Sequence, residues 1–174
     1  FISKFDENGE LHWTQTYQTD AKTYAKGLAT DPVGNVYMTG VSGTGGDNRE
    51  SFLIKYNDEG NIQWIEIING ENVASEDLLV GNDGFVYVTG NSGSGNIFVS
   101  KFRANNGSHV TTMTRGTDHD GTNNSGSGVF ARSITSGADG SLYITGPTTD
   151  DFDGQVHPDA DLGDVFVSKI SKND

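Results

Sequence analysis

The sequence predicts an all-β fold made of repeated units of four antiparallel strands, and three observations lead to this prediction. Glycine accounts for 24 of the 174 residues, about twice its usual share of ~7 %, which indicates many turns. A strand motif that begins with Phe occurs four times, at Phe1, Phe52, Phe98 and Phe166. A second motif, Tyr-x-Thr-Gly, occurs three times between copies of the first, at Tyr37, Tyr87 and Tyr143.

The Phe motif and the run that follows it predict two strands in each unit. The motif covers residues 1–5, 52–56, 98–102 and 166–170, and a turn ending in glycine follows the first three copies. Runs rich in aromatic and β-branched residues come next, at 11–17, 62–68 and 109–113. The first two runs carry Trp13 and Trp64, whereas the third has no tryptophan near Val110. Such residues favour strands, and Gly, Asn and Asp between them favour hairpins.

The Tyr-x-Thr-Gly motif and the segment before it predict the other two strands of each unit. The earlier strands are expected at 24–30, 74–80 and 130–135. Turns with Asp and Gly separate them from the motif strands at 36–40, 86–90 and 142–146. In chain order the sequence therefore predicts thirteen strands, beginning and ending inside a unit.

A unit of ~40–50 residues with four meandering strands has the size of a β-propeller blade. A solenoid is the alternative, although its repeats are usually shorter. We interpret residues 1–174 as a single repeat array, with approximate units at 1–17 (partial), 22–69, 74–114 and 128–170 (partial). Because open sheet edges invite pairing, we expect either flanking blades of a larger chain or self-assembly of copies.

Two segments carry a resemblance to a known family. Residues 25–40, with Asp31-Pro-Val-Gly-Asn-Val-Tyr-Met-Thr-Gly40, and residues 152–169 resemble the bacterial β-propeller repeat called SBBP. Asp77, where the first copy has Gly27, departs from the regular pattern. The resemblance implies a propeller module of an envelope-associated or secreted bacterial protein, without a uniform catalytic activity. An extracellular or cell-surface location is expected on this ground.

Composition excludes several classes of function. With 11 basic and 24 acidic side chains the net charge is −13, which opposes binding to nucleic acid or to anionic lipid. No apolar run approaches the ~18 residues that span a bilayer, so membrane insertion is not expected. The chain has no cysteine, which excludes disulfides, cysteine-ligated zinc and thiol catalysis.

The alternation of antiparallel strands sorts the loops onto two faces of the array. One face carries short turns. The other, which we call the long-loop face, carries the connections 18–23, 41–51, 70–73, 91–96, 115–128 and 147–164. Twelve acidic residues and only three basic ones, Lys22, Arg49 and Arg115, fall in these connections. Binding usually resides in long loops on a rigid scaffold, so the long-loop face is the expected site of contact with a protein or a glycan.

The segment 150–164 is the candidate metal site, because it holds six carboxylates in fifteen residues. They are Asp150, Asp151, Asp153, Asp159, Asp161 and Asp164. Calcium takes six to eight oxygen ligands in flexible geometry, so calcium is the candidate ion. A solvated acidic loop is the simpler alternative, and the EF-hand pattern is absent. Asp118, Asp120 and Asn123 form a secondary candidate in a loop that also reads as a mobile linker.

The repeated charged and aromatic residues could each have a binding role or a structural role. Lys4, Lys55, Lys101 and Lys169 could form an anion-binding ring or could be structural, with stems packed on apolar surface. Lys26, Glu76 and Arg132 occupy one aligned position on the innermost strands, where they could face a ligand or pair between blades. Trp13 and Trp64 could stack on sugars or pack between blades. In each case we favour the structural reading.

The sequence contains no recognisable catalytic constellation. The four histidines are dispersed, although His119 and His157 both fall on the long-loop face and could form an acid/base pair. We therefore expect a non-enzymatic scaffold or binding module that contacts protein or glycan, with calcium as a candidate stabilising ion. The alternative is a propeller hydrolase or lyase with a metal or carboxylate site on the acidic long-loop face.

Overall fold

The computed structural model describes residues 1–43, 49–70, 73–93, 95–116, 128–149, 151–152 and 163–171. All regular structure in these residues is β-strand, in thirteen strands. The strands are β1 (Ile2–Phe5), β2 (Leu11–Gln15), β3 (Thr23–Thr30), β4 (Val36–Gly43), β5 (Arg49–Tyr56), β6 (Ile62–Ile68), β7 (Ala74–Val80), β8 (Phe85–Ser92), β9 (Asn96–Arg103), β10 (His109–Arg115), β11 (Ser133–Ser136), β12 (Leu142–Thr148) and β13 (Asp164–Ile170). No helix that could cross a membrane occurs in the described part of the chain.

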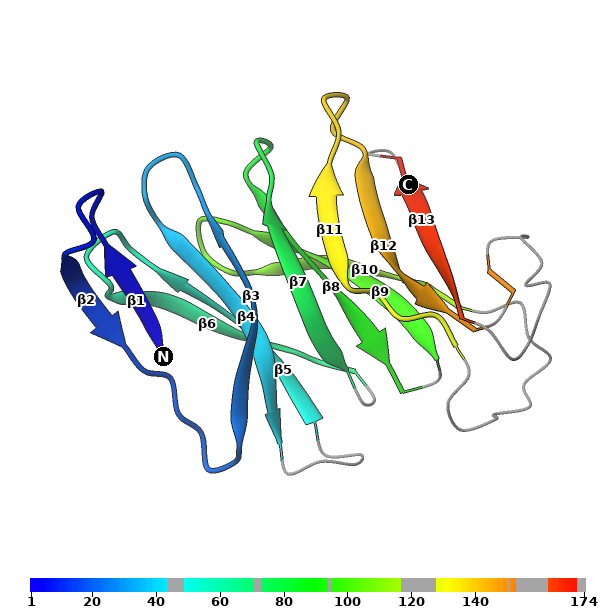
Figure 1. The fold of residues 1–174 in the computed structure, drawn as a ribbon, viewed down its shortest axis with the longest axis horizontal. Helices are drawn as coiled ribbons and strands as arrows, with labels where there is room; N and C mark the ends of the chain where they lie inside the picture. Colours follow the sequence, from blue (N-terminus) through cyan, green and yellow to red (C-terminus); the bar gives the residue numbers. More distant parts are fainter. Residues whose placement is uncertain are drawn as a thin grey trace.

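The strands form four antiparallel sheets that follow one another along the chain. The sheets are β1-β2, β3-β4-β5-β6, β7-β8-β9-β10 and β11-β12-β13, and we number them first to fourth. They stand in a row, with β1-β2 at one end and β13 at the other (Figure 1). The strands β3, β7 and β11 are neighbours across the row. This arrangement confirms the predicted all-β fold of four-stranded blades and corresponds to part of a β-propeller.

Three apolar cores lie between consecutive sheets. Between the first and second sheets, Ile2 and Trp13 pack against Met38, Phe52 and Tyr56. The core between the second and third sheets contains Tyr37, Leu53, Ile68, Val73, Leu78, Val86, Val88, Phe98 and Phe102. The core between the third and fourth contains Tyr87, Ile97, Val99, Val129, Ala131, Ile134, Leu142, Ile144, Phe152, Phe166 and Ile170. Each sheet is therefore held by burial against its neighbours.

Burial along the central strands shows which sheets are covered on both faces. In β4 five consecutive residues, from Val36 to Gly40, are buried, and β8 is buried in the same way from Val86 to Gly90. Strands covered on both faces have continuous buried runs, whereas strands with one solvated face alternate. In β12 and β13 buried and more exposed residues alternate. The fourth sheet thus has one covered face and one open face.

The Tyr-x-Thr-Gly motif ties three strands of a sheet together. Its threonine hydroxyl donates to the carbonyl of the first Phe-motif residue on the neighbouring strand, from Thr39 to Phe52 at 2.7 Å and from Thr89 to Phe98 at 2.9 Å. Its glycine lies against the innermost strand, where a Cβ at Gly40 would meet the carbonyl oxygen of Tyr24. The motif therefore requires a hydroxyl and then a residue without a side chain.

Several strand bounds differ from the expectation. Because β4 extends to Gly43 and β5 begins at Arg49, more than half of the expected connection 41–51 is strand. The segment expected as a strand at 130–135 forms β11 only from Ser133, although Phe130 N and Arg132 N still donate to the β12 carbonyls of Pro147 and Thr145. The first tryptophan run ends at Gln15, because Tyr17 turns out of the ladder and packs on Phe52 with ring centroids 4.9 Å apart.

Candidate functional site

Only part of the predicted calcium site can be placed. Asp150, Asp153, Asp159 and Asp161 lie outside the described residues, as do Asp118, Asp120, Asn123, His119 and His157. Asp164 begins β13 opposite Thr148. Phe152, next to Asp151, is buried and packs on Phe166 at 4.8 Å between ring centroids. Among the residues that the structure describes, no three His, Asp or Glu side chains gather in a way that could hold a metal ion.

Two of the repeated lysines of the Phe motif, Lys4 and Lys55, connect their sheet to the next. Lys4 Nζ contacts the Asp58 carboxylate and donates to the Asp58 carbonyl at 3.2 Å. Lys55 Nζ donates to the carbonyl of Ala104 at 2.9 Å. Asp58 and Ala104 occupy the same position in the turns β5–β6 and β9–β10. Lys4 and Lys55 therefore have a structural role between sheets.

Three of the Phe-motif lysines, Lys55, Lys101 and Lys169, also lie over the tyrosine of the neighbouring motif. The Nζ of Lys55 is 5.2 Å from the ring centroid of Tyr37, Lys101 is 5.3 Å from Tyr87, and Lys169 is 5.5 Å from Tyr143. Such contacts of a cation with an aromatic face are attractive. The lysine and the tyrosine thus form one packing unit that recurs along the chain.

An aspartate in the preceding turn completes this unit. Tyr37 Oη donates to Asp31 at 3.2 Å, and Tyr87 Oη donates to Asp83 at 2.7 Å. Burial, together with the carboxylate charge, raises the pKa of both tyrosines above its ordinary value. In the third copy Lys169 itself pairs with Asp139 at 3.0 Å. The tyrosines therefore stay protonated and act as hydrogen-bond donors.

The pKa values of two turn carboxyls, those of Asp31 and Asp139, are lowered. Burial raises the pKa of Asp31, but hydrogen bonds from the side chain and backbone of Asn35, from Tyr37 and from Val33 outweigh it, and the net pKa is lowered. A backbone hydrogen bond from Ser141, followed by the hydrogen bond from Lys169, lowers the pKa of Asp139 to about 2. These acids support turns and have no arrangement suited to proton transfer.

The tryptophans pack between sheets. Trp13 stacks on Tyr56 at 6.5 Å between centroids and donates from Nε1 to the carbonyl of Asp58 at 2.9 Å. Trp64 packs on Tyr37 at 5.9 Å, and its Nε1 is buried without a hydrogen-bond partner. The carbonyl of Ala104 corresponds to the Asp58 carbonyl that accepts from Trp13. It already accepts hydrogen bonds from Lys55 and Tyr37. Both indoles are part of the intersheet packing.

The charges on the innermost strands form a ladder across three sheets. Glu76 pairs with Lys26 at 3.2 Å on one side and with Arg132 at 3.2 Å on the other. Lys26 and Glu76 each occupy an extra residue where the pairing register of β3 or β7 shifts. Asp77, the departure from the repeat, accepts hydrogen bonds from Ser133 Oγ at 2.9 Å and Ile134 N at 3.0 Å. These charges therefore join β3, β7 and β11.

The described surface includes three cavities that bear on the site. One, of about 360 Å³, lies between the second and third sheets and is lined by Ile68 and Phe98. Ile68 occupies the repeat position of Tyr17, which is larger and packs on Phe52 in the first unit. A second, of about 310 Å³, lies between the turns near Asp83 and Asp139. The third, of about 590 Å³, is lined by Lys22, Tyr24, Ala25, Lys26, Val41, Ser42, Gly43 and Arg49. We call the third one the basic cavity.

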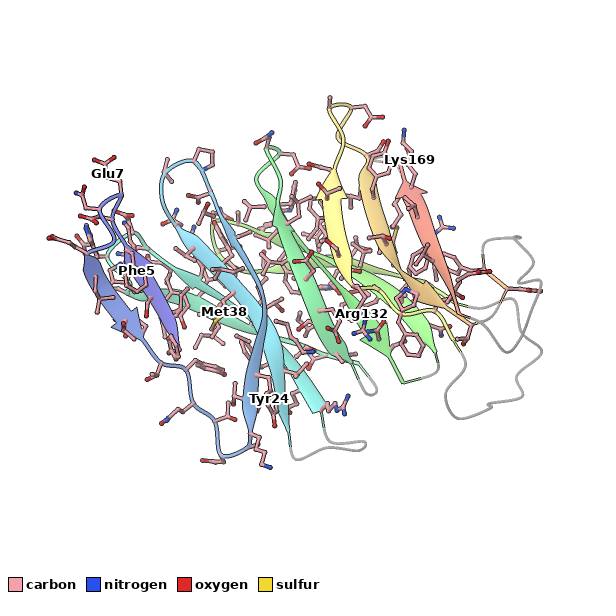
Figure 2. The ribbon with its side chains drawn as sticks, viewed as in Figure 1. Phe5, Glu7, Tyr24, Met38, Arg132 and Lys169 are labelled. Carbon is pink, nitrogen blue, oxygen red and sulfur yellow. The ribbon has the colours of Figure 1, made fainter. Side chains whose placement is uncertain are left out.

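The basic cavity lies at the long-loop end of the second sheet. Figure 2 shows Tyr24 near the end of β3 opposite to the short turns, and Lys169 at the other end of its own sheet. Two of the three basic residues of the long-loop connections, Lys22 and Arg49, line this cavity. Sequence reasoning missed the site because it summed charge over whole loops and could not see which side chains share a face.

Comparison with known proteins identifies the repeat. Residues 14–45 match the family model of the SBBP beta-propeller repeat. This segment contains β3 and β4 and the first Tyr-x-Thr-Gly motif. No curated protein matches the chain.

Proposed function

We propose that this chain, which carries the SBBP β-propeller repeat at residues 14–45, is a non-enzymatic scaffold whose long-loop face binds a protein or a glycan. The observation that carries the proposal is the structural use of the repeated polar side chains. The lysines, the turn aspartates and the ladder around Glu76 hold neighbouring strands and sheets together. Binding sites are usually formed by loops that a rigid scaffold holds in place.

The extracellular or cell-surface location is part of the same proposal and is supported by the nature of the repeat. Its test is fractionation of the source cells with an antibody to this chain. Recovery in the medium or on the outer surface is expected, and recovery only inside the cell would contradict it.

The alternative function is a hydrolase or lyase that uses a metal or a carboxylate pair on the long-loop face. The experiment that separates the two is incubation with a panel of immobilised glycans, followed by mass spectrometry of the released material. A scaffold is expected to be retained on a subset of glycans without releasing products. Shortened products that form in proportion to protein concentration would overturn the scaffold proposal.

Calcium remains the proposed stabilising ion for the segment 150–164. Calorimetric titration of calcium, compared with an Asp151→Asn/Asp153→Asn variant, tests this part. We expect heat and a raised melting temperature in the parent chain and a reduced effect in the variant. The absence of both signals in the parent would remove calcium from the proposal.

Further repeat sheets are the proposed partners of the two ends of the row. Val167 and Val165 of the fourth sheet are 73 % and 84 % exposed, whereas Leu53 and Ile97, which occupy the same repeat positions, are 0 % and 1 % exposed. At the other end Phe5 is 59 % exposed, and Tyr56 at the matching position is 0 % exposed. The two ends thus present the two halves of an intersheet core, which a flanking blade or a second copy would cover.

A further inference from the structure

We propose that the basic cavity binds a saccharide that carries a carboxylate group, of the uronic acid type. The proposal rests on the binding function proposed above and gives that function a place and a class of ligand. It follows from the register of three strands, from the charge balance at the site and from the absence of the same residues in the other units.

The strand register places five of the eight lining residues on one face of the second sheet. Tyr24 is paired with Val41, and Arg49 is paired with Gly43. Directly paired residues share a face, and Val41 and Gly43, two residues apart, point to the same side. Gly43 N donates to the carbonyl of Lys22 at 3.0 Å and extends this ladder by one residue. Lys22, Tyr24 and Arg49 therefore belong to one face of the second sheet.

This face is directed toward the third sheet. Ser51 lies on it, paired with Val41, and its hydroxyl donates to the carbonyl of Val73 at 2.9 Å. Lys26 reaches the same region from the extra residue in β3, with its Nζ 3.2 Å from Glu76 of the third sheet. The cavity is thus placed beside the junction of two sheets.

The charge of the site is opposite to that of the whole chain. Lys22, Lys26 and Arg49 line the cavity, and none of the described residues that line it is acidic. Glu50, which follows Arg49, is not among the residues that line the cavity. Glu76 is already shared between Lys26 and Arg132. Three cations in one concave site repel one another and concentrate positive potential, and a bound anion relieves both effects.

An exposed aromatic ring accompanies the cations. Tyr24 is 54 % exposed, so its ring is available to the face of a sugar. Arg49 provides the forked donor that suits a carboxylate. The volume of about 590 Å³ lies within the ~300–1,000 Å³ of ligand pockets. A carboxylate next to a pyranose ring matches this combination of groups.

The next unit does not repeat the site. Tyr24 and Arg49 correspond to Ala74 and Gly95 in the next unit, as aligned by the Phe and Tyr-x-Thr-Gly motifs. The packing lysines and tyrosines, by contrast, recur as contacting pairs in three units. Residues that occur in one unit only are not needed for the repeat, which favours a specific function for them.

The test is calorimetric titration of the whole 174-residue chain at low salt with sodium D-glucuronate, D-glucose and sodium acetate. We expect glucuronate to bind at least ~10-fold more tightly than glucose, because a charge-assisted hydrogen bond is stronger than a neutral one. Acetate, which has no ring, is expected to bind more weakly than glucuronate. Added salt is expected to weaken glucuronate binding.

Three variants assign the binding to the cavity. Arg49→Gln is expected to weaken glucuronate binding ~10-fold. Tyr24→Ser is expected to weaken the binding of glucuronate and not that of acetate. Arg103→Gln removes the same charge from an exposed residue at the opposite end of the corresponding strand, and it should change the affinity by less than ~2-fold. Melting curves confirm that each variant is folded.

Two results would overturn the inference. Equal affinity for glucose and glucuronate, or no binding of glucuronate, would exclude an acidic sugar as the ligand. Equal binding of acetate and glucuronate, unchanged by Tyr24→Ser, would show a simple anion site. Neither result would contradict the scaffold proposal. That proposal is tested by the glycan panel, in which the release of products is the contrary outcome.

Discussion

At the scale of single residues, repeat positions that differ in one atom show what that atom contributes. Tyr56 occupies the position of Phe5 and Phe102 in the Phe motif, and its hydroxyl is buried without a hydrogen-bond partner among the described residues. Burial raises the pKa of Tyr56 above its ordinary value. The Tyr56 ring belongs to the core between the first two sheets, where it stacks on Trp13. Its hydroxyl makes no hydrogen bond with the described residues.

We therefore predict that Tyr56→Phe raises the free energy of unfolding by about 1 kcal/mol, because an unpaired buried hydroxyl is costly. Thermal or urea unfolding measures the change. Tyr37→Phe is the matched control. It is expected to lower stability by about 1 kcal/mol, since the Tyr37 hydroxyl donates to Asp31 and to the carbonyl of Ala104. Equal effects of the two substitutions would contradict this account.

Asp31 predicts a pH dependence of stability. The pKa of its carboxyl is lower in the folded chain than its ordinary value, so the folded state binds the proton less readily than the unfolded state. Its contribution is present above the unfolded pKa of about 4 and is lost as pH falls through the folded pKa. We expect the melting temperature to fall between about pH 5 and pH 2, and to fall less steeply in Asp31→Asn. The pKa values of Asp6 and Asp139 are also lowered, so some dependence persists. An unchanged slope in the variant would contradict the prediction.

At the scale of strands, the glycine of the Tyr-x-Thr-Gly motif is set by the innermost strand beside it. A Cβ at Gly90 would meet the carbonyl oxygen of Ala74 and would lie 2.7 Å from the Cα of Ser75. Backbone cannot move away as a flexible side chain can. At Gly163, by contrast, the nearest atom is the Thr148 carbonyl oxygen at 3.9 Å.

We predict that Gly90→Ala lowers the free energy of unfolding by about 3 kcal/mol or more, as expected for overpacking against fixed backbone. Gly163→Ala should change it by less than about 0.5 kcal/mol. Chemical denaturation of the two variants checks both values. A tolerated alanine at Gly90 would mean that β7 and β8 are less closely joined than described.

The strands also show which parts of the structure can be predicted from the sequence alone. Repetition predicts the strands well, because each motif carries a recurring constraint, such as the Thr39 hydroxyl on the carbonyl of Phe52. Repetition also led us to favour structural roles for Lys55 and Trp64, which the contacts support. The basic cavity was not predicted. Tyr24 and Arg49 are not repeated in the next unit. The face that they share follows from strand pairings outside the two motifs.

At the scale of the whole molecule, the sheet faces at the two ends of the row are open, whereas the equivalent faces between sheets are covered. Val99 and Val167 are equivalent residues, paired with the threonines of their motifs, Thr89 and Thr145. Val99 is 5 % exposed between the third and fourth sheets, whereas Val167 is 73 % exposed. The proposal that a further repeat sheet covers this face follows from the exposure of its apolar residues. The packing of Val99 in the core between the third and fourth sheets is the model for that contact.

The last prediction compares these two valines directly. Val99→Asp should lower the free energy of unfolding by more than about 3 kcal/mol, because it buries a charge without a partner. Val167→Asp should change it by less than about 0.5 kcal/mol in the isolated chain. Val167→Asp should nevertheless weaken association through the open face, measured as the concentration dependence of mass in sedimentation, since a repeat sheet packed there would bury residue 167 as it buries residue 99. Phe5→Asp should have the same effect from the opposite end of the row. If the parent chain stays monomeric at every concentration and neither substitution alters the packing of an added repeat sheet, the end faces are not docking surfaces.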